Sequence, residues 1–456
     1  MLNFKNDPLL LEKETINALI RNKNNQFIFL EEENHFLNLF SAFVKKDDFV
    51  KKDKITQPLQ KTAYGKISLN LTNEIKQRFS DKEIIHLFEE YFGRRSNLIH
   101  AVPKWKETKT FPLVILRLLS ANNTELSRFL NEVEYYTDFL KKSRFYSPKN
   151  LNELLNSQLV YLAGCSIGDG NIDGAGKRWT LVEGSSKRER LLLSRKFISN
   201  ISGLLRNYVN HYEVKEYETK YTIRINNKLF CRFMNFFFNH PFGKKKRAIL
   251  EKPLILNFSN QDLEKYFWRG CFDTDGSVNV NGVVDFCSSD KNLLIQCLNY
   301  LEKKGIGARK SGNLIVIDTP SLKNFADIGF SHPRKQVQFL DRLRKGTKLL
   351  NIKIKYSGEI NKALLEIYPY LRFDQNGYGI QIQRKILNKY RKRHLKHIIN
   401  KLFGCQLRET TQNRLYFKSK KANNYLKSKF IIEPYWKPIN KNEEIELLNR
   451  WNKIWS

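Results

Sequence analysis

The sequence predicts an α+β fold made of two pseudo-symmetric halves, each with the element order α-β-β-α-β-β-α. Three observations predict it: two similar apolar segments each end in Asp-Gly, landmarks recur in one order after both, and short alternating strands come after each. The halves occupy residues 151–260 and 261–350. We expect a helical N-terminal region at 1–150 and a basic accessory C-terminal region at 351–456.

A nine-residue motif is present in two degenerate copies, at 162–170 and 268–276. Both contain Gly-Cys, three further residues and then Asp-Gly, and their aspartates, Asp169 and Asp275, are 106 positions apart. An Asp-Gly pair after an apolar run is by itself an ordinary helix end. The assignment therefore depends on the segments that come after each copy.

Two further landmarks recur after the motif copies. A Ser-Ser pair followed by Lys occurs at 185–187 and again, with one Asp inserted, at 288–291, an offset of 103. A Phe-x-His-Pro segment occurs at 238–241 and at 330–333, an offset of 92. Shrinking offsets in a constant order are typical of an internal duplication that has lost residues between landmarks.

The element order of each half is predicted by periodicity. After the first motif we expect strands near 172 and at 179–183, a helix at 187–208, strands at 212–217 and 221–225, and a helix at 229–238. After the second motif we expect strands at 278–280 and 283–286, a helix at 293–304 and a strand at 314–318.

The two motif copies resemble the motif that names the LAGLIDADG homing endonucleases. The first copy matches at Leu162, Ala163, Gly164, Asp169 and Gly170, and the second keeps Gly270, Asp273, Asp275 and Gly276. The resemblance implies that the two motif helices pack closely through small residues, and that antiparallel strands form a saddle along the DNA major groove. Ile167 replaces a residue that is often acidic in the family, and Trp268-Arg269 replaces a small apolar pair. Unequal halves in one chain suit a monomer and a long asymmetric target site.

The family resemblance also implies the chemistry: hydrolysis of one phosphodiester bond in each DNA strand with Mg²⁺ or Mn²⁺. The expected metal ligands are Asp169 and Asp275, with Gly168 and Thr274 beside them. Carboxylates are the hard oxygen ligands that such ions prefer. A lysine near each scissile phosphate would offset transition-state charge, and the expected ones are Lys335 and Lys244. A Lys run beside Pro and Gly is also typical of a solvated loop.

Two sets of side chains are candidates for DNA contact. Those expected on the saddle are Lys177, Arg178, Lys215, Lys220, Arg224, Asn226, Asn279, Asn281, Arg309 and Lys310. Arg and Lys pair with guanine and Asn with adenine. A helix-turn-helix is also predicted at about 82–120, where Arg94, Arg95 and Asn97 would face a groove. A plain pair of core helices fits that segment equally.

Composition favours a nucleic-acid partner. The chain has 80 Lys and Arg against 46 Asp and Glu, a formal net charge of +34, which a polyanion would relieve. No apolar run approaches the roughly 20 residues of a spanning helix, and the first eight residues have no signal-peptide pattern. Six cysteines without a C-x-x-C pair argue against structural zinc and for reduced thiols. We expect a soluble, intracellular, cytoplasmic protein that binds no membrane.

The last region lies outside the resemblance. Residues 381–402 have the pattern of a basic amphipathic helix, 415–417 and 430–432 are strand-like, and the tail at 447–455 is helical. The basic segment suits either phosphate contact or a solvated helix face. Because the termini lack splice-junction residues, we expect a free-standing endonuclease.

Three functions are compatible with these patterns. The first is a site-specific double-stranded DNA endonuclease of the homing type. The second is an intron RNA maturase, with intron RNA as its partner, because maturases share the fold. The third is a non-cleaving DNA-binding regulator. Retention of Asp169 and Asp275 favours cleavage, since paired carboxylates repel phosphate and give a pure binder no advantage.

Overall fold

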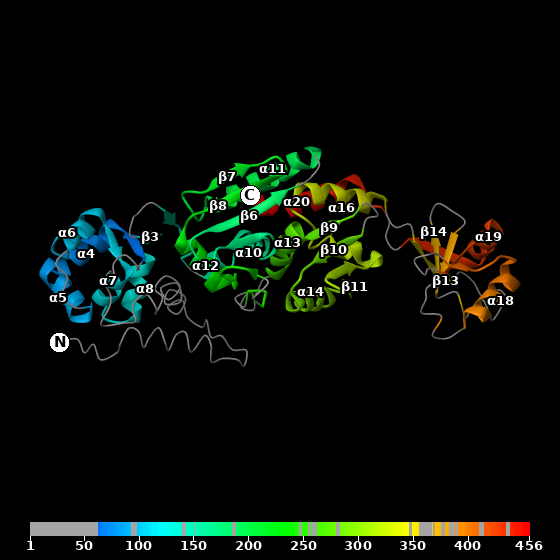
Figure 1. Cartoon of the computed structure of the whole chain (residues 1–456), viewed down its shortest axis with the longest axis horizontal. Coiled ribbons are helices and arrows are strands. Elements are labelled where there is room, and N and C mark those ends of the chain that lie inside the picture. The colour runs from blue at the N-terminus through cyan, green and yellow to red at the C-terminus, as the bar shows by residue number, and fades with distance from the viewer. Residues whose placement is uncertain are drawn as a thin grey trace.

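The structure of the chain is a computed structural model, in which three parts lie side by side along the longest axis (Figure 1). The residues that the structure describes are 63–92, 98–138, 143–149, 151–184, 188–245, 249–253, 256, 262–279, 283–345, 349–354, 367, 370–374, 379–382, 387, 391–409, 415–434 and 438–456. None of the helices among them has the length and apolar character that a membrane crossing requires.

The first half has the predicted order. It consists of α10 (Ser157–Gly168), β5 (Gly170–Ile172), β6 (Trp179–Gly184), α11 (Arg188–Leu205), β7 (Glu213–Glu216), β8 (Lys220–Ile225) and α12 (Lys228–Phe238). Its antiparallel sheet has the strand order β5-β6-β8-β7. Asn156 starts α10 as its N-cap, accepting a hydrogen bond from the Leu159 N–H at 2.8 Å.

The second half repeats this order. It consists of α13 (Glu264–Asp275), β9 (Gly276–Val278), β10 (Val284–Cys287), α14 (Lys291–Lys303), β11 (Ala308–Ser311), β12 (Leu314–Ile317), α15 (Leu322–Phe325) and α16 (Pro333–Lys345). Its sheet, β11-β12-β10-β9, has the equivalent pairing. The α+β fold and its duplication are therefore confirmed. The sequence did not reveal β11, because Ala308-Arg309-Lys310-Ser311 lacks an apolar alternation.

The N-terminal region contains helices α4 (Leu69–Arg78), α5 (Asp81–Phe92), α6 (Leu98–Thr108), α7 (Leu113–Leu119) and α8 (Asn123–Asn131). It also contains an unpredicted sheet of β1 (Tyr64–Ile67), β2 (Thr110–Pro112), β3 (Val133–Thr137) and β4 (Arg144–Phe145). Strand β1 pairs with β2 and β3 across long sequence separations, and β4 has only two residues, so local periodicity gives no signal for these strands. The turn between α5 and α6, with Arg94, Arg95 and Asn97, lies outside the described residues, and the helix-turn-helix remains a prediction.

The accessory region forms its own sheet and core. Its strands are β13 (Leu349–Ile354), β14 (Leu371–Asp374), β15 (Gly379–Ile382), β16 (Arg408–Glu409), β17 (Leu415–Lys418) and β18 (Phe430–Pro434), with helices α18 (Lys392–Phe403) and α19 (Lys420–Lys429). The strand-like segments at 415–417 and 430–432 are confirmed. The basic helix was placed too early, because Gln381 pairs with Tyr416 in the sheet and α18 begins only at Lys392.

The chain end returns to the central part. Helix α20 (Lys441–Asn452) and the turn η7 (Lys453–Trp455) come after the accessory unit and pack on the core of the second half (Figure 1). The Trp451 indole N–H donates to the Ala326 carbonyl at 2.8 Å. The Trp455 ring meets Tyr161 of α10 edge-on, at 5.2 Å between centroids. This tail therefore contacts elements of both halves.

Candidate active site at the crossed motif helices

The motif helices α10 and α13 cross with their backbones in contact. A Cβ added to Gly164 would lie 2.0 Å from the Phe267 carbonyl oxygen, and one added to Gly270 would lie 2.3 Å from that of Tyr161. No side chain fits at such distances, so both positions require glycine. The close approach holds the C-terminal ends of the two helices together.

Asp169 and Asp275 lie at these adjoining helix ends. A Cβ on Gly168 would meet the Thr274 hydroxyl at 1.9 Å and the Asp275 Oδ2 at 3.5 Å, so the two motif ends touch. Burial, followed by the charges of Asp275 and Glu183, raises the pKa of Asp169 to about 6. Burial also raises the pKa of Asp275. Asp169 still reaches solvent, so the pair forms an accessible site of concentrated negative charge.

Two lysines lie behind the carboxylates in equivalent positions. Lys335 Nζ donates to the carbonyl oxygens of Phe272 at 3.0 Å, Asp273 at 2.6 Å and Thr274 at 3.0 Å. These carbonyls belong to the last turn of α13, where a cation also complements the helix dipole. Burial lowers the pKa of Lys335.

Lys245 makes the same contacts at the end of α10. Its Nζ donates to the carbonyl oxygens of Ser166 at 3.0 Å and Ile167 at 2.7 Å, and to that of Gly168. Burial lowers its pKa to about 8. Lys244, the lysine predicted for this half, is exposed, so the structural counterpart of Lys335 is Lys245.

The landmark spacing explains why Lys245 was missed. Lys335 follows His332 by three positions, whereas Lys245 follows His240 by five. The extra residues form a turn in which Gly243 has φ +79°, a conformation that favours glycine. Allowing for a two-residue insertion at this Gly would have identified Lys245.

The halves differ next to the carboxylates. Asp273 is fully buried, accepts a hydrogen bond from the Tyr161 hydroxyl at 2.7 Å and another from the Ser331 N–H at 2.9 Å. Burial raises its pKa. The corresponding residue of α10 is the apolar Ile167. Asp273 therefore links α13 to Tyr161 of α10 by a buried hydrogen bond, which the apolar Ile167 cannot make.

The two landmark histidines are also buried and have different partners. His332 Nε2 lies 3.2 Å from Glu183 Oε1 of the opposite half, and its ring stacks on Phe197 at 4.4 Å. His240 Nε2 instead lies 3.0 Å from the Ser166 carbonyl oxygen of its own half. Both positions are consistent with turn-shaping roles rather than proton transfer.

The donor set tests whether a metal ion fits. Within the described part of the chain, no cluster of three or more His, Cys, Asp or Glu side chains could form an all-protein site. Two carboxylates nevertheless fit Mg²⁺, which keeps several waters and takes further oxygens from phosphate. The carbonyls of Gly168 and Thr274 already accept from Lys245 and Lys335, which disfavours them as ligands. Their predicted metal role remains untested.

The saddle of the first half has a basic open face. Lys215, Lys220 and Arg224 lie on the same side as the exposed Val182, opposite the buried Leu181 and Ile223. Glu213 shares this face and pairs with Lys215 at 3.2 Å and with Arg224 at 3.7 Å. Asn226 comes directly after β8 and is exposed, and Lys177 and Arg178 lie in the β5–β6 connection. The first-half candidates are therefore placed where duplex DNA could reach them.

The second-half candidates are more divided. Arg309 shares the open face with Asp285 and pairs with Asp318 at 2.8 Å. Lys310 aligns instead with the buried Ile315, so it lies on the helix-covered side and its predicted base contact is not supported. Successive side chains of a strand point to opposite faces, so the neighbours Arg309 and Lys310 cannot both lie on the open face. Asn279 is exposed and its side chain accepts from the Val283 N–H at 3.0 Å; Asn281 lies outside the described residues.

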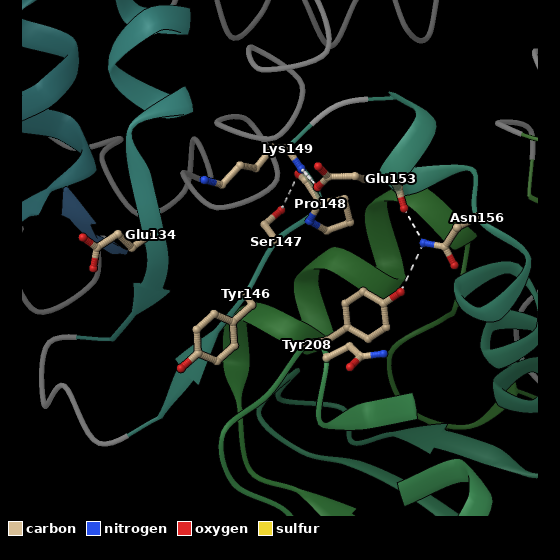
Figure 2. Close-up of a pocket in the computed structure, with 9 residues that line it drawn as sticks. Glu134, Tyr146, Ser147, Pro148, Lys149, Glu153, Asn156 and Tyr208 are labelled. Atoms are coloured by element: carbon tan, nitrogen blue, oxygen red, sulfur yellow. Dashed lines mark hydrogen bonds between the residues drawn. The ribbon is translucent and has the colours of Figure 1, made fainter. Parts of the chain in front are cut away.

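A separate cavity lies where the N-terminal region meets the first half (Figure 2). It has a volume of about 830 Å³ and is lined by Glu134, Tyr146, Ser147, Pro148, Lys149, Glu153, Asn156, Asn207 and Tyr208. Asn156 Nδ2 donates to the Tyr208 hydroxyl at 3.2 Å. The cavity adjoins the N-terminal end of α10, whereas Asp169 lies at the C-terminal end of that helix. We therefore assign the cavity no part in the chemistry.

Comparison with known proteins agrees with the geometry. Residues 262–327 match the family model described as the LAGLIDADG-like domain. This match lies in the second half, which contains the second motif copy, and it confirms the resemblance to the LAGLIDADG family.

Three individual proteins are also similar. The chain is 24% identical over 284 residues to the probable translation initiation factor IF-2 of Methanocaldococcus jannaschii, covering 56% of this chain and 23% of that relative. A structure of the homing endonuclease I-WcaI bound to its DNA recognition sequence is 16% identical, with a TM-score of 0.27, covering 38% of this chain and 81% of that one. A double mutant of I-SmaMI is 11% identical, with a TM-score of 0.26, covering 41% and 88%.

Proposed function

We propose that the protein is a site-specific double-stranded DNA endonuclease of the homing type, dependent on Mg²⁺ or Mn²⁺. The observation that carries the proposal is the meeting of Asp169 and Asp275 at the glycine crossing, each with a lysine behind it. Two carboxylates with raised pKa values stand side by side. Two ionised carboxylates so close together repel each other, which is unfavourable unless a bound cation or a proton reduces their charge.

The chain's own residues have separate roles in cleavage. Bound Mg²⁺ would lower the pKa of a coordinated water and stabilise the leaving oxyanion. Asp169 and Asp275 would supply carboxylate ligands to the ion. Lys245 and Lys335 place positive charge at the helix ends, where it offsets the charge of the carboxylates and of the phosphates. The antiparallel sheets would hold the duplex above this pair.

The test is incubation of the purified protein with a plasmid library of randomised DNA, in Mg²⁺ or in EDTA, followed by sequencing of the ends. Discrete Mg²⁺-dependent breaks with a fixed stagger are expected. Binding without breaks would reject the nuclease and favour an intron RNA maturase or a DNA-binding regulator, for which intron RNA is the next ligand. Breaks in EDTA would reject the metal.

A further inference from the structure

We infer that the accessory unit, residues 349–434, is a second DNA-binding unit, and that its helix α18 holds the phosphate backbone of duplex DNA flanking the target site. The inference deepens the proposed function and rests on it, because α18 would bind the same DNA duplex that the proposed endonuclease cleaves. It assigns a role to a part of the chain that the catalytic site does not use.

The accessory unit has its own hydrophobic core. Buried Leu371, Ile380 and Phe417 lie on one sheet face. Helix α18 covers that face with a stripe of Leu395, Ile398, Ile399 and Phe403. Helix α19 lies beside it, with Tyr425 meeting Phe403 edge-on at 6.2 Å. Packing therefore fixes which sides of both helices face outward.

The outward side of α18 carries uncompensated positive charge. Arg393, Lys396 and Lys401 are exposed, and the helix contains no acidic residue. None of these three makes an ion pair with any residue that the structure describes, while Lys392 at the helix start pairs with Glu409. The neighbouring helix α19 adds the exposed Lys421.

Helix α16 gives the contrast. It is also basic, but Arg344 pairs with Glu444 of α20, and Lys345 pairs with Asp341 at 2.5 Å. Arg344 and Lys345 therefore have acidic partners within the protein, whereas Arg393, Lys396 and Lys401 of α18 have none among the described residues. Free cations spaced along one helix face match phosphates, which bind through placed charge without base readout.

The connections place this surface beside the saddle. The unit enters through β13 and leaves through β18, which are neighbouring strands. Its two connections end at α16 and α20, which the Ile439 N–H links at 3.3 Å to the Leu343 carbonyl oxygen. A doubly connected unit beside the second half (Figure 1) has a high effective concentration for flanking DNA. DNA is favoured over an unrelated acidic partner because the open sheet face of the first half also carries basic side chains, Lys215, Lys220 and Arg224.

The test measures binding of the full chain to a random-sequence DNA duplex across a salt series, so it needs no cleavage. Arg393→Gln with Lys396→Gln should weaken binding about tenfold at low salt and reduce the log–log salt slope by about 1.8, since each lost phosphate contact removes about 0.9. The matched control, Lys291→Gln with Lys303→Gln on α14, removes the same charge and should keep the wild-type slope. The conservative pair Arg393→Lys with Lys396→Arg should also keep it.

Three outcomes would overturn the inference. Equal slopes for the α18 variant and the wild type would remove the phosphate contacts. Equal losses in the α14 control would reduce the effect to net charge. Loss of binding to a random-sequence RNA hairpin, with duplex DNA binding intact, would assign α18 to RNA. Failure of the nuclease proposal appears separately, as wild-type protein that makes no breaks.

Discussion

The two halves agree at the site and differ around it. Each ends its motif helix in a carboxylate and holds the last carbonyls with one lysine. The second half adds the buried Asp273, a histidine bonded across to Glu183, and the packed C-terminal tail. The first half adds the more basic open sheet face. Both halves therefore have the carboxylate and the lysine at the end of the motif helix. The second half has more buried contacts around them, and the first half has the more basic sheet face.

The largest expected effect comes from the carboxylates, at which the halves should be equivalent. Asp169→Asn and Asp275→Asn should each lower double-strand cleavage by at least about 1,000-fold, since each would remove one of the two proposed metal ligands. DNA binding should stay within a few-fold of wild type. Linearisation of a plasmid carrying the mapped site, with a gel-shift assay for binding, measures both. Full cleavage by either variant would place the active site elsewhere.

The lysines come next. Lys245→Met and Lys335→Met keep the side-chain length but remove the charge, and each should slow cleavage by about 100-fold. Lys244→Met is the matched control, because Lys244 is exposed, and it should cut at the wild-type rate. A loss in Lys244→Met with normal Lys245→Met would reverse the assignment of the first-half lysine.

The glycine crossing should be equally intolerant from both sides. Gly164→Ala and Gly270→Ala would bring a methyl group against backbone carbonyls, at 2.0 Å and 2.3 Å, and should each lower the free energy of unfolding by about 3 kcal/mol or more. Gly203→Ala in α11 meets nothing within 4 Å and should stabilise by about 0.5–1 kcal/mol. Thermal or denaturant unfolding measures this, and a tolerated Ala at either crossing position would disprove the close contact.

The dependence of cleavage rate on pH should report the titration of the first-half residues Asp169 and Lys245. Because the folded pKa of Asp169 is raised to about 6, cleavage should fall as pH drops below that value, and higher Mg²⁺ should move this limb to lower pH. Its contribution to stability has the opposite sense: it is full below the unfolded pKa and is lost as pH rises through about 6.

Lys245, with a pKa lowered to about 8, should produce a fall in activity above that pH. Lys245→Arg should move the alkaline limb upward, because guanidinium stays protonated. Rates measured across pH at two Mg²⁺ concentrations test both limbs. A flat profile would contradict these assignments.

The smallest effect should distinguish the sheet faces. Lys220→Gln should weaken DNA binding a few-fold and lower the salt slope by about 0.9, because Lys220 forms no ion pair with any described residue, unlike Arg224, which pairs with Glu213 at 3.7 Å. Arg309→Gln should lower the slope by less than about 0.9, because Arg309 already pairs with Asp318. Equal effects per charge would show that the two faces contribute alike.

The sequence revealed the features that the duplication repeats: the element order, the crossing glycines and both carboxylates. It could not reveal β1 to β3, which pair across long sequence separations, or the two-residue strand β4. It also did not reveal Lys245, the counterpart of Lys335, because two extra residues separate Lys245 from the His-Pro landmark. The predicted DNA contact of Lys310 is not supported, because the alternation of side chains along β11 places Lys310 on the sheet face opposite to Arg309. The roles of Glu183 and Trp451 depend on contacts between segments more than 100 residues apart, for which local patterns carry no signal.

Electron paramagnetic resonance of Mn²⁺ tests the central claim most directly, namely that carboxylates from two unlike halves form one cation site. The wild-type chain and the double variant Asp169→Asn with Asp275→Asn would each be titrated with Mn²⁺ in the presence of duplex DNA. We expect tight Mn²⁺ uptake by the wild type and its loss in the variant. Equal tight uptake by both would contradict a shared carboxylate site.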